Sequence, residues 1–350
     1  MKKKIIIILI LIVLIVCGIF GGIKIKGYLP YYFDKTGMNQ PDTEYTLTIE
    51  KSDFENEVAT RLEKEGIIIS AVRFLGYIHE NYPEFVWYNG KYKLTADMSY
   101  KELCEKLSDP DERIDYVKFT VPEGKKVTEI AVIVEKAGIC SAKEFLDAAD
   151  SYDYEFAYMD ELKARDNSKI AYKLEGYLFP ATYEFRADTV TAKDVVAKML
   201  KTFEDYVKKY EDEAKGMGLS INELVTFGAV IQAEAFSKES MANISSVFWN
   251  RLNSKDMRLL QSDPTTNYAR DLRDNFEGYT KAMFDAYDTY TCIGLPVGPT
   301  NCPGTDVIEA VLHPNDTDYF YFVTDAEGNF YYNKTYKEHV NTCYKIGLWK

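Results

Sequence analysis

The sequence predicts an α+β fold, with a single N-terminal transmembrane helix, small α+β modules and a larger α+β domain. Three observations predict it. An uninterrupted apolar run occupies residues 5–23, two later segments repeat a strand, turn and helix pattern, and the second half carries longer helical patterns. A chain of 350 residues is also long enough for about two core-bearing domains.

The N-terminus has the pattern of a membrane anchor. Residues 1–4 carry three lysines, and the apolar run 5–23 that follows spans a hydrocarbon core at about 1.5 Å per residue. A cleaved signal peptide is the alternative, but no small-x-small site ends the run. The lysine bias favours a cytoplasmic tail at residues 1–4. We therefore expect a single-pass cell-membrane protein whose bulk lies outside the cytoplasm, with residues 24–44 as a linker.

Residues 45–150 contain the two similar segments. Each opens with a strand of alternating hydropathy, continues as an amphipathic helix and closes on a Gly-Ile pair. The expected strands are Tyr45–Ile49, Gly90–Leu94 and Val117–Val121, and a further helix is expected from Ser99 through Leu107. No cluster of titratable groups suited to chemistry occurs here. We expect this region to bind or to scaffold.

The second half, residues 151–350, carries the sharper patterns. A helix is expected from about Val195 to Tyr210, and a second one opens near Ser220. Ser220 and Glu223 have the spacing of a capping box, in which the hydroxyl and the carboxylate satisfy backbone N–H groups of the first turn. The apolar run Leu224–Ala235 then continues as helix.

Charge and cysteine content exclude several classes of protein. The net charge of -13 disfavours nucleic-acid binding, which needs a basic surface. Three scattered histidines and the absence of a CxxC pair argue against a zinc site, so we expect no metal and no cofactor. Cys292 and Cys302 bracket a Gly/Pro-rich loop and could form a disulfide.

Glu234 is the candidate catalytic residue. It follows Ile231, Val230 and Phe227 at i−3, i−4 and i−7, so its side chain projects from the apolar stripe of the helix. Burial and the carbonyl end of a helix both disfavour the anion, which raises a carboxyl pKa toward neutrality and suits general-acid cleavage of a glycosidic bond. The alternative is a glutamate at the stripe edge that turns into solvent.

Ordered sequence blocks identify the family that the chain resembles. From about residue 44 to the end, the chain resembles the endolytic murein transglycosylase family, also called YceG-like or MltG. The repeated Gly-Ile modules at residues 45–150 resemble its LysM-like domain, and residues 151–350 its catalytic domain. The matching blocks are Leu174–Pro180, Ala229–Ala235, Ser246–Leu252, Leu260–Thr265, Tyr290 with Gly294–Pro299, Pro303-Gly304 and Tyr319–Val323.

The resemblance implies a lyase that acts on peptidoglycan glycan strands. The family cuts the β-1,4 bond between MurNAc and GlcNAc inside nascent strands, leaves a 1,6-anhydro-MurNAc end and so terminates elongation. One carboxyl can act first as the acid and then as the base. The family's block usually has an acidic residue where this chain has Gln232, which leaves Glu234 as the block's only acid. Peptidoglycan synthases are the partners that the resemblance suggests.

The same blocks suggest residues that bind the substrate. For Asn250 and Arg251, sugar contacts and a helix-helix hydrogen bond are equally good interpretations. Asp263 could instead cap a helix, and Tyr290 could stack on a sugar or fill core. The complete predicted set is Glu175, Tyr177, Asn250, Arg251, Gln261, Asp263, Thr265 and Tyr290.

Departures from the family pattern affect substrate contacts rather than the reaction. Ala181, Val297 and Cys302 replace the acid, proline and asparagine that are usual there. Two other functions stay open at this point. One is a hydrolase that pairs Glu234 with Glu239 or Asp263. The other is a wall-binding scaffold without catalysis.

Overall fold

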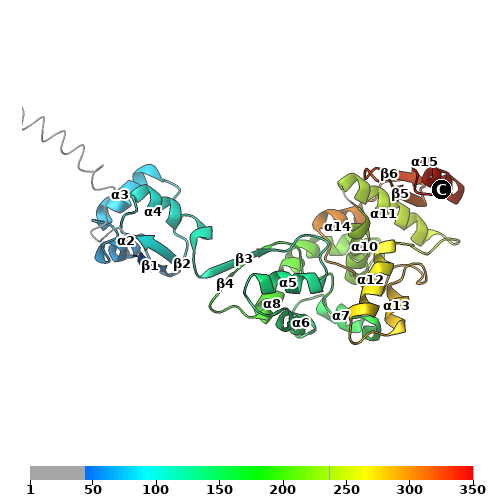
Figure 1. Ribbon diagram of the computed structural model, residues 1–350, viewed down its shortest axis with the longest axis horizontal. Helices are drawn as coiled ribbons and strands as arrows, with labels where there is room; N and C mark the ends of the chain where they lie inside the picture. Colours follow the sequence, from blue (N-terminus) through cyan, green and yellow to red (C-terminus); the bar gives the residue numbers. More distant parts are fainter. Residues whose placement is uncertain (1–43, 236, 350) are drawn as a thin grey trace, which may run out of the picture. The chain divides into compact units, whose positions relative to one another are not determined.

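A computed structural model describes residues 44–235 and 237–349 (Figure 1). The chain divides into two compact units, which meet in sequence between Tyr116 and Val117. Each unit is a mixture of helices and short two-stranded sheets, as the sequence predicts. The assignment of residues 45–150 to LysM-like modules stays a prediction.

The transmembrane helix in the predicted fold class requires a correction. Among the described residues, no helix combines the length and the apolar character needed to cross a membrane. The prediction came from residues 5–23, which lie outside the described residues, as do the tail 1–4 and nearly all of the linker 24–44. For the described residues, the fold class that the structure supports is α+β.

The first unit packs helices on one two-stranded antiparallel sheet. Strands β1 (Glu44–Ile49) and β2 (Gly90–Thr95) pair so that Leu47 lies opposite Tyr92. Both side chains are fully buried, which explains why the strands alternate in hydropathy. The helices are α2 (Glu55–Lys64), α3 (Ala71–Asn81), α4 (Tyr100–Leu107) and the short η1 (Pro110–Glu112).

The second unit begins with a strand pair that sequence analysis predicted only in part. Strand β3 (Tyr116–Thr120) was expected, but its partner β4 (Thr182–Arg186) was not. The next helices, α5 (Val127–Lys136) and α6 (Ala142–Ala149), share one hydrophobic core with the C-terminal helices. The second of the repeated segments is therefore part of the unit that contains Glu234.

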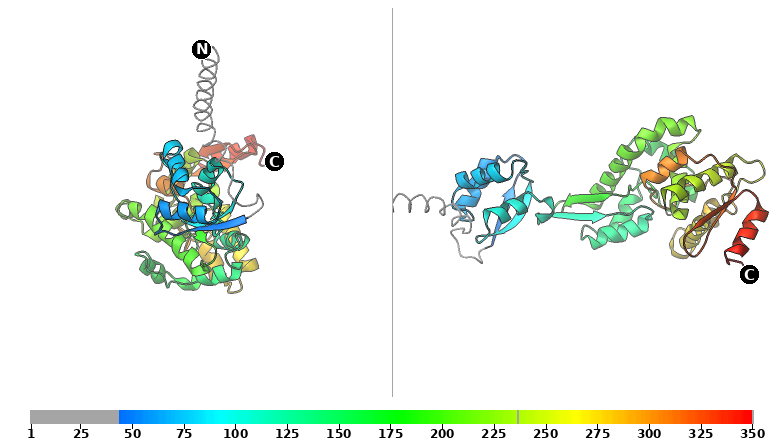
Figure 2. Two further views of the ribbon diagram at one scale, coloured as in Figure 1. Left: turned by 90° about the vertical axis from the view of Figure 1, so that its left-hand side faces the viewer. Right: turned by 90° about the horizontal axis from the view of Figure 1, so that it is seen from above.

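Figure 2 shows the remaining helices of this unit from two further sides. Helix α10 (Ile221–Glu234) packs against α11 (Lys238–Asn253), α12 (Asp263–Asn275) and α14 (Thr305–Leu312). The other elements are α7 (Met159–Ala164), η2 (Asn167–Lys169), α8 (Ala192–Val207), η3 (Lys208–Tyr210), α9 (Glu211–Gly216), α13 (Lys281–Tyr287), β5 (Tyr321–Thr324), β6 (Phe330–Asn333) and α15 (Tyr336–Lys345).

Gly176 provides a test of how tightly this core is closed. Its φ is +87°, and a Cβ built there would lie 2.3 Å from Cβ of Pro299. We expect Gly176→Ala to lower the free energy of unfolding by about 2 kcal/mol, measured by urea denaturation. Gly138 is the matched control, because its φ is +76° and nothing lies within 4 Å of its added Cβ. Gly138→Ala should cost only about 1 kcal/mol, and equal losses would contradict the packing argument.

Candidate functional site

The site centres on the last residue of helix α10. Ser220 caps the first turn, and its hydroxyl accepts from the backbone N–H of Glu223, which confirms the predicted capping box. The helix then buries Phe227, Val230 and Ile231 completely and ends at Glu234. The apolar stripe therefore brings the Glu234 carboxyl to the interior side of the helix, at the carbonyl end of the helix dipole.

A hydroxyl at the N-cap position of another helix, α12, holds the Glu234 carboxyl. Ser262 Oγ donates to Glu234 Oε1 over 2.6 Å, so the carboxyl does not extend freely into solvent. Burial raises the pKa of Glu234 to about 6, the negative charge of Asp263 adds to the rise, and the Ser262 hydrogen bond and the Arg251 charge oppose it. A glutamic acid with this pKa can give up its proton and take one back near neutral pH.

Ser262 is itself fixed by threonine hydroxyls. Its backbone N–H donates to Thr289 Oγ1 over 2.8 Å, and Thr265 Oγ1 lies 2.8 Å from the same Thr289 oxygen. Gln261 adopts a φ of +50°, unusual for a residue with a side chain, and its N–H donates to the Thr289 carbonyl over 3.1 Å. These bonds define one backbone position for the turn that presents Ser262 to Glu234.

The predicted residues of helix α11 donate hydrogen bonds to backbone carbonyls. Asn250 Nδ2 donates to the carbonyls of Thr317 and Tyr319, each over 2.9 Å. Arg251 is 5% exposed and donates to the carbonyls of Phe320, over 2.7 Å, and Leu260. Both side chains therefore join α11 to chain segments that flank the site.

Asp263 and Tyr290 lie together on the exposed side. Tyr290 Oη donates to Asp263 Oδ1 over 2.8 Å, and both residues interact electrostatically with Glu234. The Tyr290 side chain is 45% exposed, which leaves much of it available to a ligand. Of the predicted substrate-binding residues, these two and Gln261 combine exposure with proximity to the Ser262 turn.

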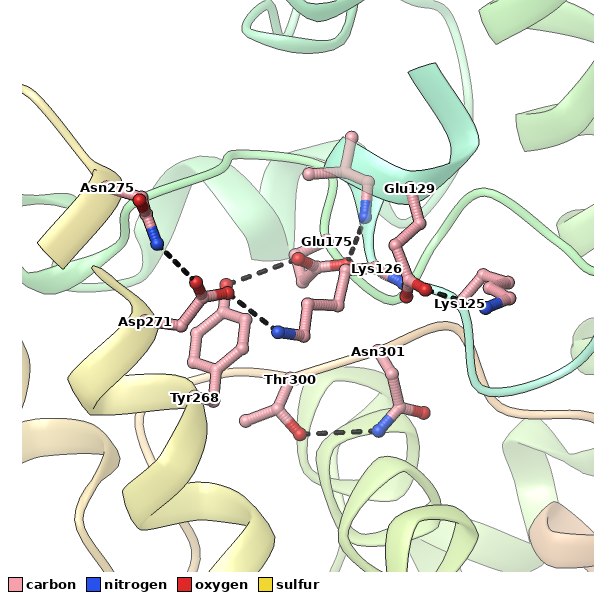
Figure 3. Close-up of polar contacts among 10 residues, drawn as sticks. Lys125, Lys126, Glu129, Glu175, Tyr268, Asp271, Asn275, Thr300 and Asn301 are labelled. Atoms are coloured by element: carbon pink, nitrogen blue, oxygen red, sulfur yellow. Dashed lines mark hydrogen bonds and ion pairs between the residues drawn. The ribbon is translucent and has the colours of Figure 1, made fainter. Parts of the chain in front are cut away.

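Glu175 and Tyr177 occupy the interior, away from the Ser262 turn. Tyr177 is fully buried, packs on Tyr158 and donates its hydroxyl to Asn222 Oδ1 over 2.9 Å. Glu175 is 1% exposed and accepts from the backbone N–H of Val127 and from Tyr268 Oη (Figure 3). The structure thus divides the predicted set into residues near Glu234 and residues of the core behind it.

Sequence analysis missed two residues of the site, Ser262 and Thr289. Ser262 stands between Gln261 and Asp263, both of which were selected, and its position before Pro264 is typical of a helix N-cap. In the structure it is the N-cap residue of α12, but its side chain makes no capping bond and turns to Glu234 instead. Thr289 directly precedes Tyr290, and only the fold brings it to the turn.

The five cysteines in the described part of the chain are all free. Cys292 and Cys302 are both free, so they form no disulfide. Within residues 44–235 and 237–349, no group of three or more His, Cys, Asp or Glu side chains could hold a metal ion. The expectation that the protein uses no metal or cofactor stays a prediction.

The Ser262 hydrogen bond predicts a change in pH dependence. It stabilises the carboxylate and lowers the pKa of Glu234, so Ser262→Ala should raise that pKa further above about 6. A general acid must start protonated, and activity falls as the pH rises through its pKa. The falling limb of kcat/KM against pH should therefore move to higher pH in the variant. An unmoved limb, or one at lower pH, would contradict this assignment.

The fold and the site define a class of protein: an α+β protein in which a partly buried carboxyl, Glu234, has its pKa raised toward neutrality. Residues 47–345 match the model of the YceG-like family. An endolytic murein transglycosylase of Bacillus subtilis is 32% identical over 308 residues, which are 85% of this chain and 83% of that protein. An endolytic murein transglycosylase of Streptococcus pneumoniae is 30% identical over 84% of this chain and 57% of its own length.

A solved structure agrees with these sequence relatives. The crystal structure of a putative yceG-like protein from Listeria monocytogenes is 30% identical, with a TM-score of 0.56, and the match covers 85% of this chain and 98% of that one. The chain belongs to the YceG-like family.

Proposed function

We propose that the protein is an endolytic lytic transglycosylase that cleaves peptidoglycan glycan strands, with Glu234 as its single acid and base. The observation that carries the proposal is the Glu234 carboxyl, which is held by Ser262 and has its pKa raised to about 6. The relatives from Bacillus subtilis and Streptococcus pneumoniae are named endolytic murein transglycosylases, and these names supply the substrate class and the type of reaction.

The chemistry needs only this carboxyl. In its protonated form, Glu234 donates to the glycosidic oxygen as the bond from MurNAc C1 to that oxygen breaks, which releases the GlcNAc hydroxyl. The carboxylate then accepts the proton of the MurNAc C6 hydroxyl, whose oxygen forms a bond to C1. The product is a 1,6-anhydro-MurNAc end, no water is consumed, and Glu234 is protonated again.

The surroundings of Glu234 favour this route over hydrolysis. A hydrolase needs a second carboxylate to activate water or to form an ester. Asp263 is the carboxylate that interacts with Glu234, but it already accepts a hydrogen bond from the Tyr290 hydroxyl. Gln232, at the family's usual acidic position, accepts from the backbone N–H of Gly304 over 3.0 Å and is engaged in loop packing.

The partners and the location follow from the substrate. Cutting nascent strands would terminate their elongation, so we include peptidoglycan synthases as partners. The glycan polymer lies outside the cytoplasm, and we place the unit that contains Glu234 there as well.

Product analysis tests the proposal directly. The full-length protein is incubated with nascent, uncrosslinked glycan strands, and the fragments are analysed by mass spectrometry. Anhydro and reducing ends differ by one water, so the masses identify the reaction. Anhydro ends in internal cuts are expected. Reducing ends alone would identify a hydrolase, and intact strands would favour the non-catalytic scaffold.

A further inference from the structure

Glu175 is a buried carboxyl that the proposed reaction does not use. At 1% exposure it cannot reach a glycan strand. Its Oε1 accepts from the N–H of Val127 over 2.9 Å, and its Oε2 accepts from Tyr268 Oη over 3.2 Å. One carboxyl therefore joins the first residue of α5 to the middle of α12, two elements far apart in the sequence (Figure 3).

A second pair joins the same two helices. Lys126 Nζ lies 2.7 Å from Asp271 Oδ2 and 5.8 Å from the centre of the Tyr268 ring. Lys126 is the N-cap residue of α5, and its side chain forms no capping bond. The acceptor that the first turn of α5 requires comes from Glu175 instead. Glu175 and Lys126 thus hold α12 at neighbouring positions on its length.

Helix α12 is the element that carries the hydroxyl partner of Glu234. Ser262 occupies the N-cap position of α12, about 9 Å along the axis from Tyr268 at the rise of an α-helix. A helix of this length moves as a rigid body, so a shift at Tyr268 is transmitted to Ser262. The Ser262 Oγ to Glu234 Oε1 bond is 2.6 Å long, and a small displacement would break it.

We propose that Glu175 is a positioning residue for the transglycosylase reaction: by accepting from Val127 and Tyr268 it fixes α12 against α5 and sets the place of Ser262 at Glu234. This inference rests on the proposed function of Glu234. It assigns Glu175 to the support of the acid and not to the binding of sugar.

Two substitutions at Glu175 separate positioning from acid–base chemistry. Glu175→Ala removes both acceptors, and we expect kcat to fall about tenfold with KM nearly unchanged, less than the roughly hundredfold that a 1 Å misplacement can cost. Glu175→Gln should retain activity within about threefold, because its amide oxygen can accept from Val127 while its NH2 group donates to the Tyr268 oxygen. A Gln variant as inactive as the Ala variant would overturn the proposal, as would a raised KM at unchanged kcat.

The coupling to Ser262 is the decisive measurement. In Glu175→Ala the falling limb of the pH profile should move to higher pH, as in Ser262→Ala. When Ser262 is already alanine, Glu175→Ala should lower kcat by less than about threefold, because the bond that it positions is absent. Independent losses that multiply would overturn the proposal. Tyr268→Phe, which removes only the hydroxyl, repeats the test if Glu175→Ala does not fold.

A matched pair of residues elsewhere in the same unit controls for a general loss of packing in the fold. Tyr210 Oη donates to Glu309 Oε1 over 2.6 Å and joins η3 to α14 in the same chemical way. Glu309→Ala and Tyr210→Phe should leave kcat and the pH limb unchanged, and equal effects there would overturn the positioning role. All rates are measured as the number of glycosidic bonds cut per unit time, so the coupling can be measured whether the products are anhydro or hydrated. Hydrated wild-type products would contradict the proposed function but not the positioning role of Glu175.

Discussion

Glu234→Gln is expected to lower the rate of glycan cleavage by a factor of about 10² to 10⁴, the contribution usual for a general acid–base group. The amide keeps the size of the side chain, and its oxygen can still accept from Ser262, so the site should stay folded. It cannot donate a proton to the leaving oxygen or take one from the C6 hydroxyl. Single-turnover cleavage of uncrosslinked strands, with thermal unfolding of the same sample, gives the measurement.

Two carboxyl variants serve as controls for this prediction. Glu239 is in the first turn of α11 and Asp263 in the first turn of α12, and a hydrolase would need one of them. Glu239→Gln and Asp263→Asn should both remain far more active than Glu234→Gln. If either one loses as much activity as Glu234→Gln, the one-carboxyl chemistry is wrong.

The position of Glu234 could be predicted because local patterns determine it. A capping box locates the start of α10, and the period of buried residues places Glu234 on the interior stripe. Its partner could not be found in this way. Ser262 is 28 residues away, and a serine between two selected polar residues has no signature of its own. Only the packing of α12 on α10 brings the two side chains together.

The hydrogen-bond partners of several selected residues could not be predicted, because they are backbone groups. Asn250 and Arg251 were predicted to bind sugar or to join two helices, and in the structure their acceptors include the carbonyls of Thr317, Tyr319 and Phe320. A carbonyl is present in every residue, so no pattern marks which one will be used. In the same way, the Leu174–Pro180 block drew attention to Glu175 without indicating that a helix N-terminus and a buried tyrosine would surround it.

The strands also differ in how clearly the sequence predicts them. The β1 and β2 strands show clear alternation and were predicted, since each buries one face against helices. The β4 strand was missed, although Tyr183 is buried between the exposed Thr182 and Glu184. Its five residues are separated by only one residue from the Leu174–Pro180 block, and a pattern so short becomes evident only beside its partner β3.

Arg251→Ala is expected to lower the free energy of unfolding by about 3 kcal/mol, because one buried and one partly buried carbonyl lose a charged donor and a cavity opens. Burial lowers the pKa of Arg251 only to about 10, so the guanidinium is charged at neutral pH and donates to Phe320 and Leu260. The carbon of its guanidinium group also lies 5.4 Å from the centre of the Tyr321 ring. Urea denaturation measures the loss.

Stability and activity together distinguish the two interpretations of Arg251. Exposed Arg273, paired with neighbouring Asp274, is the control, and its alanine variant should change stability by less than about 0.5 kcal/mol. Arg251→Ala should also slow cleavage through kcat, because Leu260 precedes the turn of Gln261 and Ser262. If stability is unchanged while KM rises, Arg251 binds the sugar directly, and its bonds to Phe320 and Leu260 contribute little to the fold.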